Sequence, residues 1–171
     1  MRGPAFLYRF PDARVGWELG TALERSTSRP SRPLMPIVTV TRRLTFNAAH
    51  RVHNPALSDA ENDALFGKCN NPNWHGHNYV LEVSVTGPVS EKTGYVMDLG
   101  ALKKIVNEHV VDKMDHRNLN IEVDFMRGVI PTTENIVVAC WRVIAPAIAP
   151  AKLKRLRLWE TENNHVEYEG Q

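Results

Sequence analysis

At 171 residues, the chain is long enough to form one domain with a buried core, without disulfide support. Its 43% hydrophobic and 23% charged residues are typical of a soluble globular protein. The only cysteines, Cys69 and Cys140, do not suggest a disulfide framework, and no apolar run reaches the roughly 20 residues that span a bilayer. We therefore expect a cytoplasmic protein without a membrane partner.

The charge distribution gives no reason to expect nucleic-acid binding. The formal net charge is +2, but residues 1–36 contain six arginines and only three acidic residues, so residues 37–171 are slightly negative. A basic run at residues 152–157 alternates with apolar residues, which favours a strand with one solvated face over a basic patch that binds nucleic acid.

Residues 1–36 differ from the rest of the chain. They include five prolines and a run rich in serine and arginine, a composition that predicts disorder. Three origins are compatible with it: a tail, an organelle transit peptide, or translated sequence upstream of the true start. Met35 directly precedes the first patterned strand and favours the last, and the acidic residues count against a transit peptide. We expect the folded domain to be residues 37–171.

The first elements are strands separated by a long loop. Alternating apolar residues predict a strand from Ile37 to Phe46, interrupted by Arg42 on its apolar face, and another over residues 78–86. The intervening loop, residues 51–76, is long enough to contain a functional segment, with a short helix at residues 58–65 capped by Ser58 and Glu61. A turn at residues 91–94 and a short strand at residues 95–97 follow.

Two helices and two strands complete the chain. Asp98 can cap a helix whose apolar stripe includes Leu102, Val106 and, partly facing the core, His109. A second helix begins near Thr132 or Thr133 and carries Cys140 in its buried face. Strands at residues 153–161 and 165–169 form a hairpin through Asn163-Asn164. Hairpins combined with helices on one face indicate an α+β fold.

His75-Gly76-His77 is the most informative motif. Side chains two residues apart on a strand project to the same side, so one metal ion can contact both histidines. His50, at the end of the first strand, could supply a third ligand. Three imidazoles with an open fourth position are typical of a catalytic zinc site. A His-x-His pair alone also occurs in ordinary solvated strands.

Cys69 and the pair Asp115-His116 are further candidates. The polar surroundings of Cys69, with Lys68 beside it, favour a reactive thiolate over a buried structural thiol. An aspartate beside a histidine can raise the basicity of the imidazole and allow proton transfer, although such a pair at a helix end is also a common cap.

Five segments in order resemble the 6-pyruvoyl tetrahydropterin synthase family. They are FGKCNNPN at 66–73, HGHNY at 75–79, MDHRNL at 114–119, TTEN at 132–135 and ETENN at 160–164. The long loop before Cys69 is more similar to 6-pyruvoyl tetrahydropterin synthase proper than to the related 6-carboxytetrahydropterin synthase of queuosine biosynthesis. Trp74 departs from the family pattern, which has a smaller residue there, and we expect it to reshape the pocket rim. Residues 1–36 have no counterpart.

The resemblance implies a tunnelling fold, with a four-stranded antiparallel sheet, two helices on one face, and trimers stacked into hexamers around a β-barrel. It implies one zinc ion per subunit on His50, His75 and His77. Cys69 would transfer protons, assisted by Asp115 and His116 from a neighbouring subunit. Glu160 would anchor the pterin ring, with Thr132, Thr133 and Glu134 nearby.

The implied activity is that of a zinc-dependent lyase. It would convert 7,8-dihydroneopterin triphosphate to 6-pyruvoyl tetrahydropterin with release of triphosphate, and magnesium would accompany the triphosphate. Two alternatives remain open: a 6-carboxytetrahydropterin synthase that also releases acetaldehyde, and a non-catalytic zinc- and pterin-binding protein. A Cys-His-Asp hydrolase is a fourth interpretation, which leaves the three histidines without a role.

Overall fold

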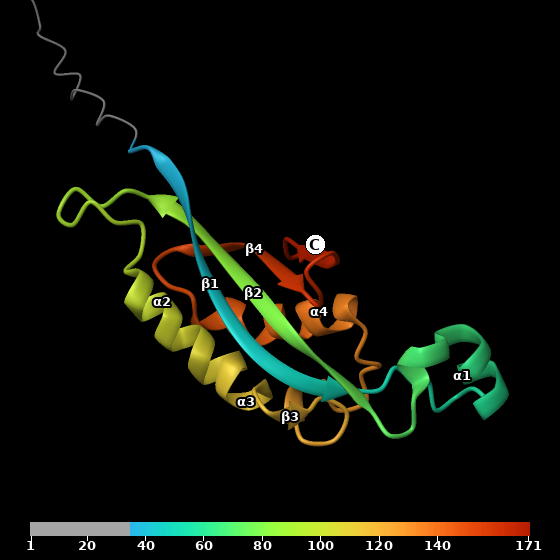
Figure 1. Cartoon of the computed structure of the whole chain (residues 1–171). Coiled ribbons are helices and arrows are strands. Elements are labelled where there is room, and N and C mark those ends of the chain that lie inside the picture. The colour runs from blue at the N-terminus through green and yellow to red at the C-terminus, as the bar shows by residue number, and fades with distance from the viewer. Residues whose placement is uncertain (1–34) are drawn as a thin grey trace, which may run out of the picture. The chain divides into compact units, whose positions relative to one another are not determined.

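The computed structural model describes residues 35–171, and the expectation for residues 1–36 lies almost wholly outside this range. Its central element is the antiparallel pair β1 (Ile37–His50) and β2 (His75–Pro88), which are in register along all 14 residues of each strand. β4 (Lys152–Trp159) extends the sheet beside β2, and β5 (His165–Tyr168) closes that side (Figure 1).

The sheet is mixed and five-stranded, in the order β3-β1-β2-β4-β5. The expected four antiparallel strands are present, but a two-residue strand, β3 (Arg117–Asn118), adds to the outer edge of β1 in the parallel direction. No sequence pattern predicts so short a strand, because it has too few residues to establish a period. The prediction of a purely antiparallel four-stranded sheet is therefore wrong, whereas the α+β class is confirmed.

The helices cover one face of this sheet. α2 (Leu99–Val106) begins at the Asp98 cap and continues through a π turn, Asn107–Val111, into α3 (Asp112–Met114). α4 (Thr133–Ile144) is capped by Thr132, begins where the sequence predicts, and packs against β4 and β5. α1 (Asp59–Phe66), with the predicted Ser58–Glu61 capping box, lies beyond the end of β1 that carries His50 (Figure 1).

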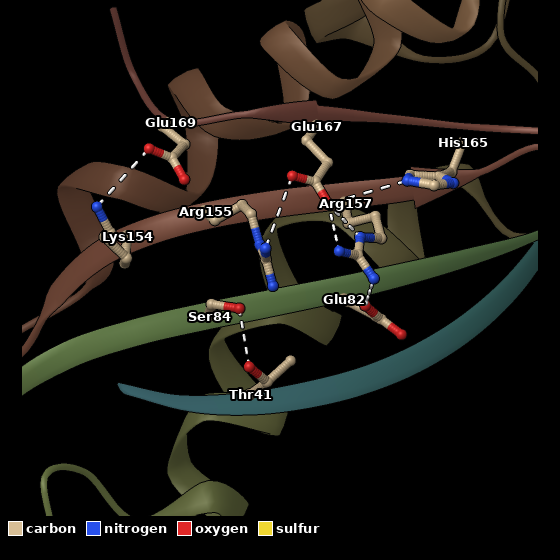
Figure 2. Close-up of polar contacts among 9 residues, drawn as sticks. All are labelled: Thr41, Glu82, Ser84, Lys154, Arg155, Arg157, His165, Glu167 and Glu169. Atoms are coloured by element: carbon tan, nitrogen blue, oxygen red, sulfur yellow. Dashed lines mark hydrogen bonds and ion pairs between the residues drawn. The ribbon is translucent and has the colours of Figure 1, made fainter. Parts of the chain in front are cut away.

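The two faces of the sheet differ in chemistry. Alternate residues of the strands pack against the helices in one core, which includes Phe46, Tyr79, Leu81, Leu156 and Leu158. The other face is polar: Thr41 bonds Ser84 across β1 and β2, and Arg157 bridges Glu82 and Glu167 (Figure 2). The basic run of β4 thus has acidic partners on the neighbouring strands and directly after β5, as the interpretation of a solvated strand face requires.

Three local predictions are wrong. Residues 95–97 form no strand, because the neighbours of β2 in the sheet are already β1 and β4, and Tyr95 lies in an exposed loop. His109 is exposed, since the π turn shifts the phase of the helix and leaves Val110 and Met114 to fill the core. β4 ends at Trp159 and not at Thr161, so the β4–β5 connection is five residues long, from Glu160 to Asn164.

None of the helices within residues 35–171 combines the length and apolar character that crossing a membrane requires.

Candidate metal centre and active site

The register of β1 and β2 brings three histidines together. His50 is directly opposite His75, and His77 is opposite Ala48, so all three side chains are on the same face of the pair. One ligand atom from each lies within 4.8 Å of the others, a spacing that a single metal ion can bridge. The His-Gly-His interpretation, with His50 as a third member, is therefore confirmed as a cluster that could bind a metal.

Hydrogen bonding prepares His50 for this role. Its Nδ1 is 2.8 Å from the Pro131 carbonyl oxygen, which can only accept, so Nδ1 carries the proton and Nε2 keeps its lone pair. A carbonyl or carboxylate behind a ligand histidine typically fixes the tautomer in this way. Pro131 was missed at the sequence level, since a backbone carbonyl leaves no trace in residue identity.

Two nitrogen atoms of the cluster are suited to bind a metal ion. His50 Nε2 and His75 Nδ1 are buried and have no hydrogen-bond partner, an arrangement that is costly unless another group completes it. Burial lowers the pKa of His50, although the hydrogen bond to Pro131 acts in the opposite direction. The pKa of His75 is also lowered, mainly by burial and to a smaller extent by the neighbouring His77. Both imidazoles thus favour the neutral form that metal binding requires.

Glu160 lies against the histidines at the start of the β4–β5 connection. Its Oε1 is 3.7 Å from His50 Nε2 and 3.8 Å from His77 Nε2. About a quarter of this side chain is exposed, so the carboxylate is at the boundary between the histidine cluster and solvent. Tyr79, two residues after His77, adds a buried hydroxyl without a partner, and burial raises its pKa.

Cys69 opens onto the same site. An open cavity of about 670 Å³ is lined by Gly67, Lys68, Cys69, Asn71, His75 and His77. Cys69 is exposed within a 3₁₀ turn, Gly67–Asn70, that follows α1. The thiol, a lysine and two of the candidate metal ligands therefore share one cavity.

The other predicted residues lie apart from this cavity. The Asp115 carboxylate is 2.9 Å from His116 Nδ1 and accepts a bond from the Asn47 backbone N–H, and none of the contacts described for residues 35–171 joins the pair to Cys69. Thr132 caps α4 directly after Pro131, whereas on its first turn Thr133 is half-buried and Glu134 is exposed.

Trp74 is not on the rim of the cavity that contains Cys69. It lines a separate cavity of about 240 Å³ with Arg51, His53 and Asn120. Its backbone has a φ of 68°, a left-handed conformation that is unfavourable for a bulky residue.

The comparisons with known proteins place the chain in a family. The family model for 6-pyruvoyl tetrahydropterin synthase matches residues 39–171. The human 6-pyruvoyl tetrahydrobiopterin synthase is 44% identical over 132 residues, which are 77% of this chain and 91% of the human protein. This chain belongs to the 6-pyruvoyl tetrahydropterin synthase family.

The structural comparison agrees. The structure of Caenorhabditis elegans 6-pyruvoyl tetrahydropterin synthase superposes with a TM-score of 0.72 at 43% identity, covering 80% of this chain and 98% of that one. A putative 6-carboxy-5,6,7,8-tetrahydropterin synthase from Archaeoglobus fulgidus is 43% identical, but over only 94 residues and 54% of this chain. The synthase proper is thus the more extensive match.

Proposed function

We propose that this protein converts 7,8-dihydroneopterin triphosphate to 6-pyruvoyl tetrahydropterin and releases triphosphate. The observation that carries the proposal is the cavity that Cys69, His75 and His77 line together, with the Glu160 carboxylate beside His77, in a chain of this synthase family. The reaction is an elimination with internal proton transfers, so it needs a base and an electrophile but no redox cofactor.

We propose zinc as the metal of the site. Three imidazoles are the ligand set of an open catalytic zinc site, and the neutral tautomer of His50 is already fixed by Pro131. Zinc held by His50, His75 and His77 would act as a Lewis acid on the side-chain hydroxyls of the substrate. Magnesium would accompany the triphosphate as a counter-ion rather than as a resident of the protein.

Three side chains of the site have different roles in this proposal. The Cys69 thiolate removes a proton from the substrate side chain and returns it at the neighbouring position. Glu160 binds the adjacent N–H donors of the pterin ring through its two carboxylate oxygens, a selective geometry. Lys68 contributes a positive charge on the wall of the same cavity, which suits a triphosphate substrate.

Assembly would supply the remaining residues. On this proposal the tunnelling fold forms trimers that stack into hexamers around a β-barrel, and Asp115 and His116 reach the cavity of a neighbouring subunit, with Thr132, Thr133 and Glu134 near the pterin. In support, the described outer edge of β1 pairs with β3 only at Ala48 and Ala49, so most of this long edge is free to pair with a second copy.

Product identification tests the function. Purified protein is incubated with 7,8-dihydroneopterin triphosphate, and the pterin products are analysed by mass spectrometry. The expected result is the 6-pyruvoyl product with one triphosphate per turnover. Formation of the 6-carboxy product with acetaldehyde would favour the alternative synthase, and tight pterin binding without turnover would favour the non-catalytic interpretation.

A further inference from the structure

Directly after Cys69 is a buried amide whose oxygen and nitrogen both have hydrogen-bond partners. Asn70 is 2% exposed. Its Oδ1 is 3.0 Å from Arg51 Nε and 3.0 Å from His53 Nδ1, and its Nδ2 donates to Asp63 Oδ1 at 2.6 Å. The amide oxygen faces nitrogen donors and the amide nitrogen faces a carboxylate, so only one orientation of this side chain satisfies its neighbours.

This amide joins three separate parts of the site. Asp63 comes from α1, and Cys69 and Asn70 come from the 3₁₀ turn that follows it. Arg51 and His53 come from the segment after β1. Arg51 Nε also donates to the backbone carbonyl of Asn70 at 2.8 Å, so one guanidinium holds both the side chain and the main chain of Asn70.

The same contacts tie Cys69 to a candidate metal ligand. The backbone N–H of Val52 donates to the carbonyl of Cys69 at 2.8 Å, and Val52 is only two residues after His50. The intervening Arg51 is itself held, because the Asn120 side chain accepts from its N–H at 3.0 Å and donates to its carbonyl at 2.9 Å. The 3₁₀ turn is otherwise an exposed segment at residues 67–69.

We propose that Asn70, held by Arg51 and Asp63, is a positioning residue that fixes Cys69 relative to the metal-binding histidines. The inference rests on the proposed function, in which Cys69 is the base. Proton transfer is sensitive to distance, and a displacement of about 1 Å can cost roughly 100-fold in rate. An exposed thiol on a short turn needs hydrogen bonds of this kind if it is to keep one position relative to the histidines.

The main test compares Asn70→Ala with Asn73→Ala, an exposed asparagine on the same loop. For Asn70→Ala we expect kcat for triphosphate release to fall about 10- to 100-fold, with KM and the zinc content per chain unchanged. Hydrogen exchange at the Val52 amide, which reports directly on the bond to Cys69, should become at least about tenfold faster. Asn73→Ala should match the wild type in all four measurements.

A polarity exchange tests the bond itself. Asn70→Asp places two carboxylates together and should lower kcat, whereas Asn70→Asp combined with Asp63→Asn restores one donor and one acceptor and should recover most of the activity. Should Asn70→Ala fail to fold, Asp63→Ala on the exposed side of α1 removes one bond of the same amide and should lower kcat in the same way.

The outcomes separate this inference from the proposed function. If Cys69→Ala abolishes turnover while Asn70→Ala keeps the wild-type kcat and Val52 exchange, the inference is overturned and the function stands. Where Asn70→Ala folds, a fall in kcat that only follows lost zinc also overturns the inference; where it does not fold, a wild-type kcat for Asp63→Ala does so. A polarity exchange that recovers no activity overturns it as well. If Cys69→Ala retains full turnover, the base is misassigned and the positioning role fails with it.

Discussion

At the scale of single residues, the two cysteines occupy opposite environments. Cys69 is exposed in the cavity that His75 and His77 also line. Cys140 is fully buried in α4, where its Sγ is 3.8 Å from Met114 Sδ and burial raises the pKa of its thiol to about 12. Only Cys69 is placed to act on a substrate that enters from solvent.

We predict that Cys69→Ala lowers kcat for triphosphate release by at least about 100-fold, the usual contribution of a general base, with no loss of Tm. Cys140→Ala should do the reverse, lowering Tm through lost packing while kcat per folded molecule is unchanged. Steady-state kinetics and thermal denaturation of both variants measure this. Wild-type turnover by Cys69→Ala would exclude the thiol as the base.

Gly76 between two candidate ligands is required by close packing. A Cβ at this position would lie 2.9 Å from the Ala48 carbonyl oxygen on the paired strand, a contact that only a backbone shift can relieve. We predict that Gly76→Ala lowers zinc affinity at least about tenfold, because the shift displaces both neighbouring histidines. Competition with a zinc-binding dye measures this affinity.

Gly87→Ala is the matched control on the same strand. Its Cβ would meet a Val96 methyl at 3.3 Å, far along β2 from the histidines, and should leave zinc affinity unchanged. Equal zinc affinities for the two variants would show that the Ala48 contact does not set the ligand geometry.

Asp115 should make the unfolding free energy of the protein depend on pH under acidic conditions. The Asn47 backbone N–H, and secondarily His116, hold the pKa of this carboxyl below its ordinary value of 3.8. A carboxyl group whose pKa is lower in the folded state stabilises that state at pH values above the pKa of the unfolded chain. This stabilisation is lost as the pH falls through the pKa of the folded state. Asp115→Asn should therefore be less stable than the wild type at about pH 6.

The difference between these two proteins should shrink as the pH drops below 3.8. Urea denaturation at several pH values down to about pH 3 measures it. A difference in unfolding free energy that is constant across this range would contradict the assignment of the stabilising contact to the ionised carboxylate.

At the scale of elements, the β1–β2 pair carries the three histidines that could bind a metal, and its sequence signals are strong. Alternation in both strands and the His-x-His spacing are sufficient to predict that His75 and His77 share a face. The sequence leaves open which β1 residue lies opposite them, since register depends on pairing across the whole sheet. The structure resolves this by placing His50 opposite His75.

Other elements were less predictable, for identifiable reasons. The Ser58–Glu61 capping box is a local signal and predicted α1 almost to the residue. The π turn beneath His109 and the parallel strand β3 depend on tertiary packing and carry no local signature. The hydrogen bonds of Asn70 to Arg51 and Asp63 could not be predicted from the sequence either. Arg51 and Asp63 are distant from one another in sequence, and none of the three residues belongs to a periodic pattern.

The capping box itself offers a prediction. α1 is short, and its start is capped by Ser58, whose Oγ accepts from the Glu61 N–H while the Glu61 carboxylate accepts from the Ser58 N–H. Ser58→Ala should lower the local stability of α1 by about 1 kcal/mol. Exchange of the Asn62 amide, which donates to the Ser58 carbonyl, should accelerate accordingly, and unchanged exchange would contradict this role.

At the scale of the whole molecule, the exposed part of the β1 edge predicts association. Ile37 is 68% exposed and Val38 is 40% exposed at one end of this edge, and free strand edges tend to pair with other chains. We predict that residues 35–171 form a trimer or hexamer, measurable by light scattering coupled to size-exclusion chromatography. Substitution of Thr39 or Thr41 by proline should weaken assembly, since proline removes a backbone hydrogen-bond donor from the edge of β1. A monomer with full activity would contradict a site shared between subunits.

The central claim is that three histidines hold a zinc ion on which turnover depends. The most direct measurement is triphosphate release from 7,8-dihydroneopterin triphosphate by protein stripped with a chelator and then titrated with zinc. We predict that the stripped protein is inactive and that activity returns linearly, reaching its maximum at one zinc per chain. Undiminished turnover by fully stripped protein would contradict the account.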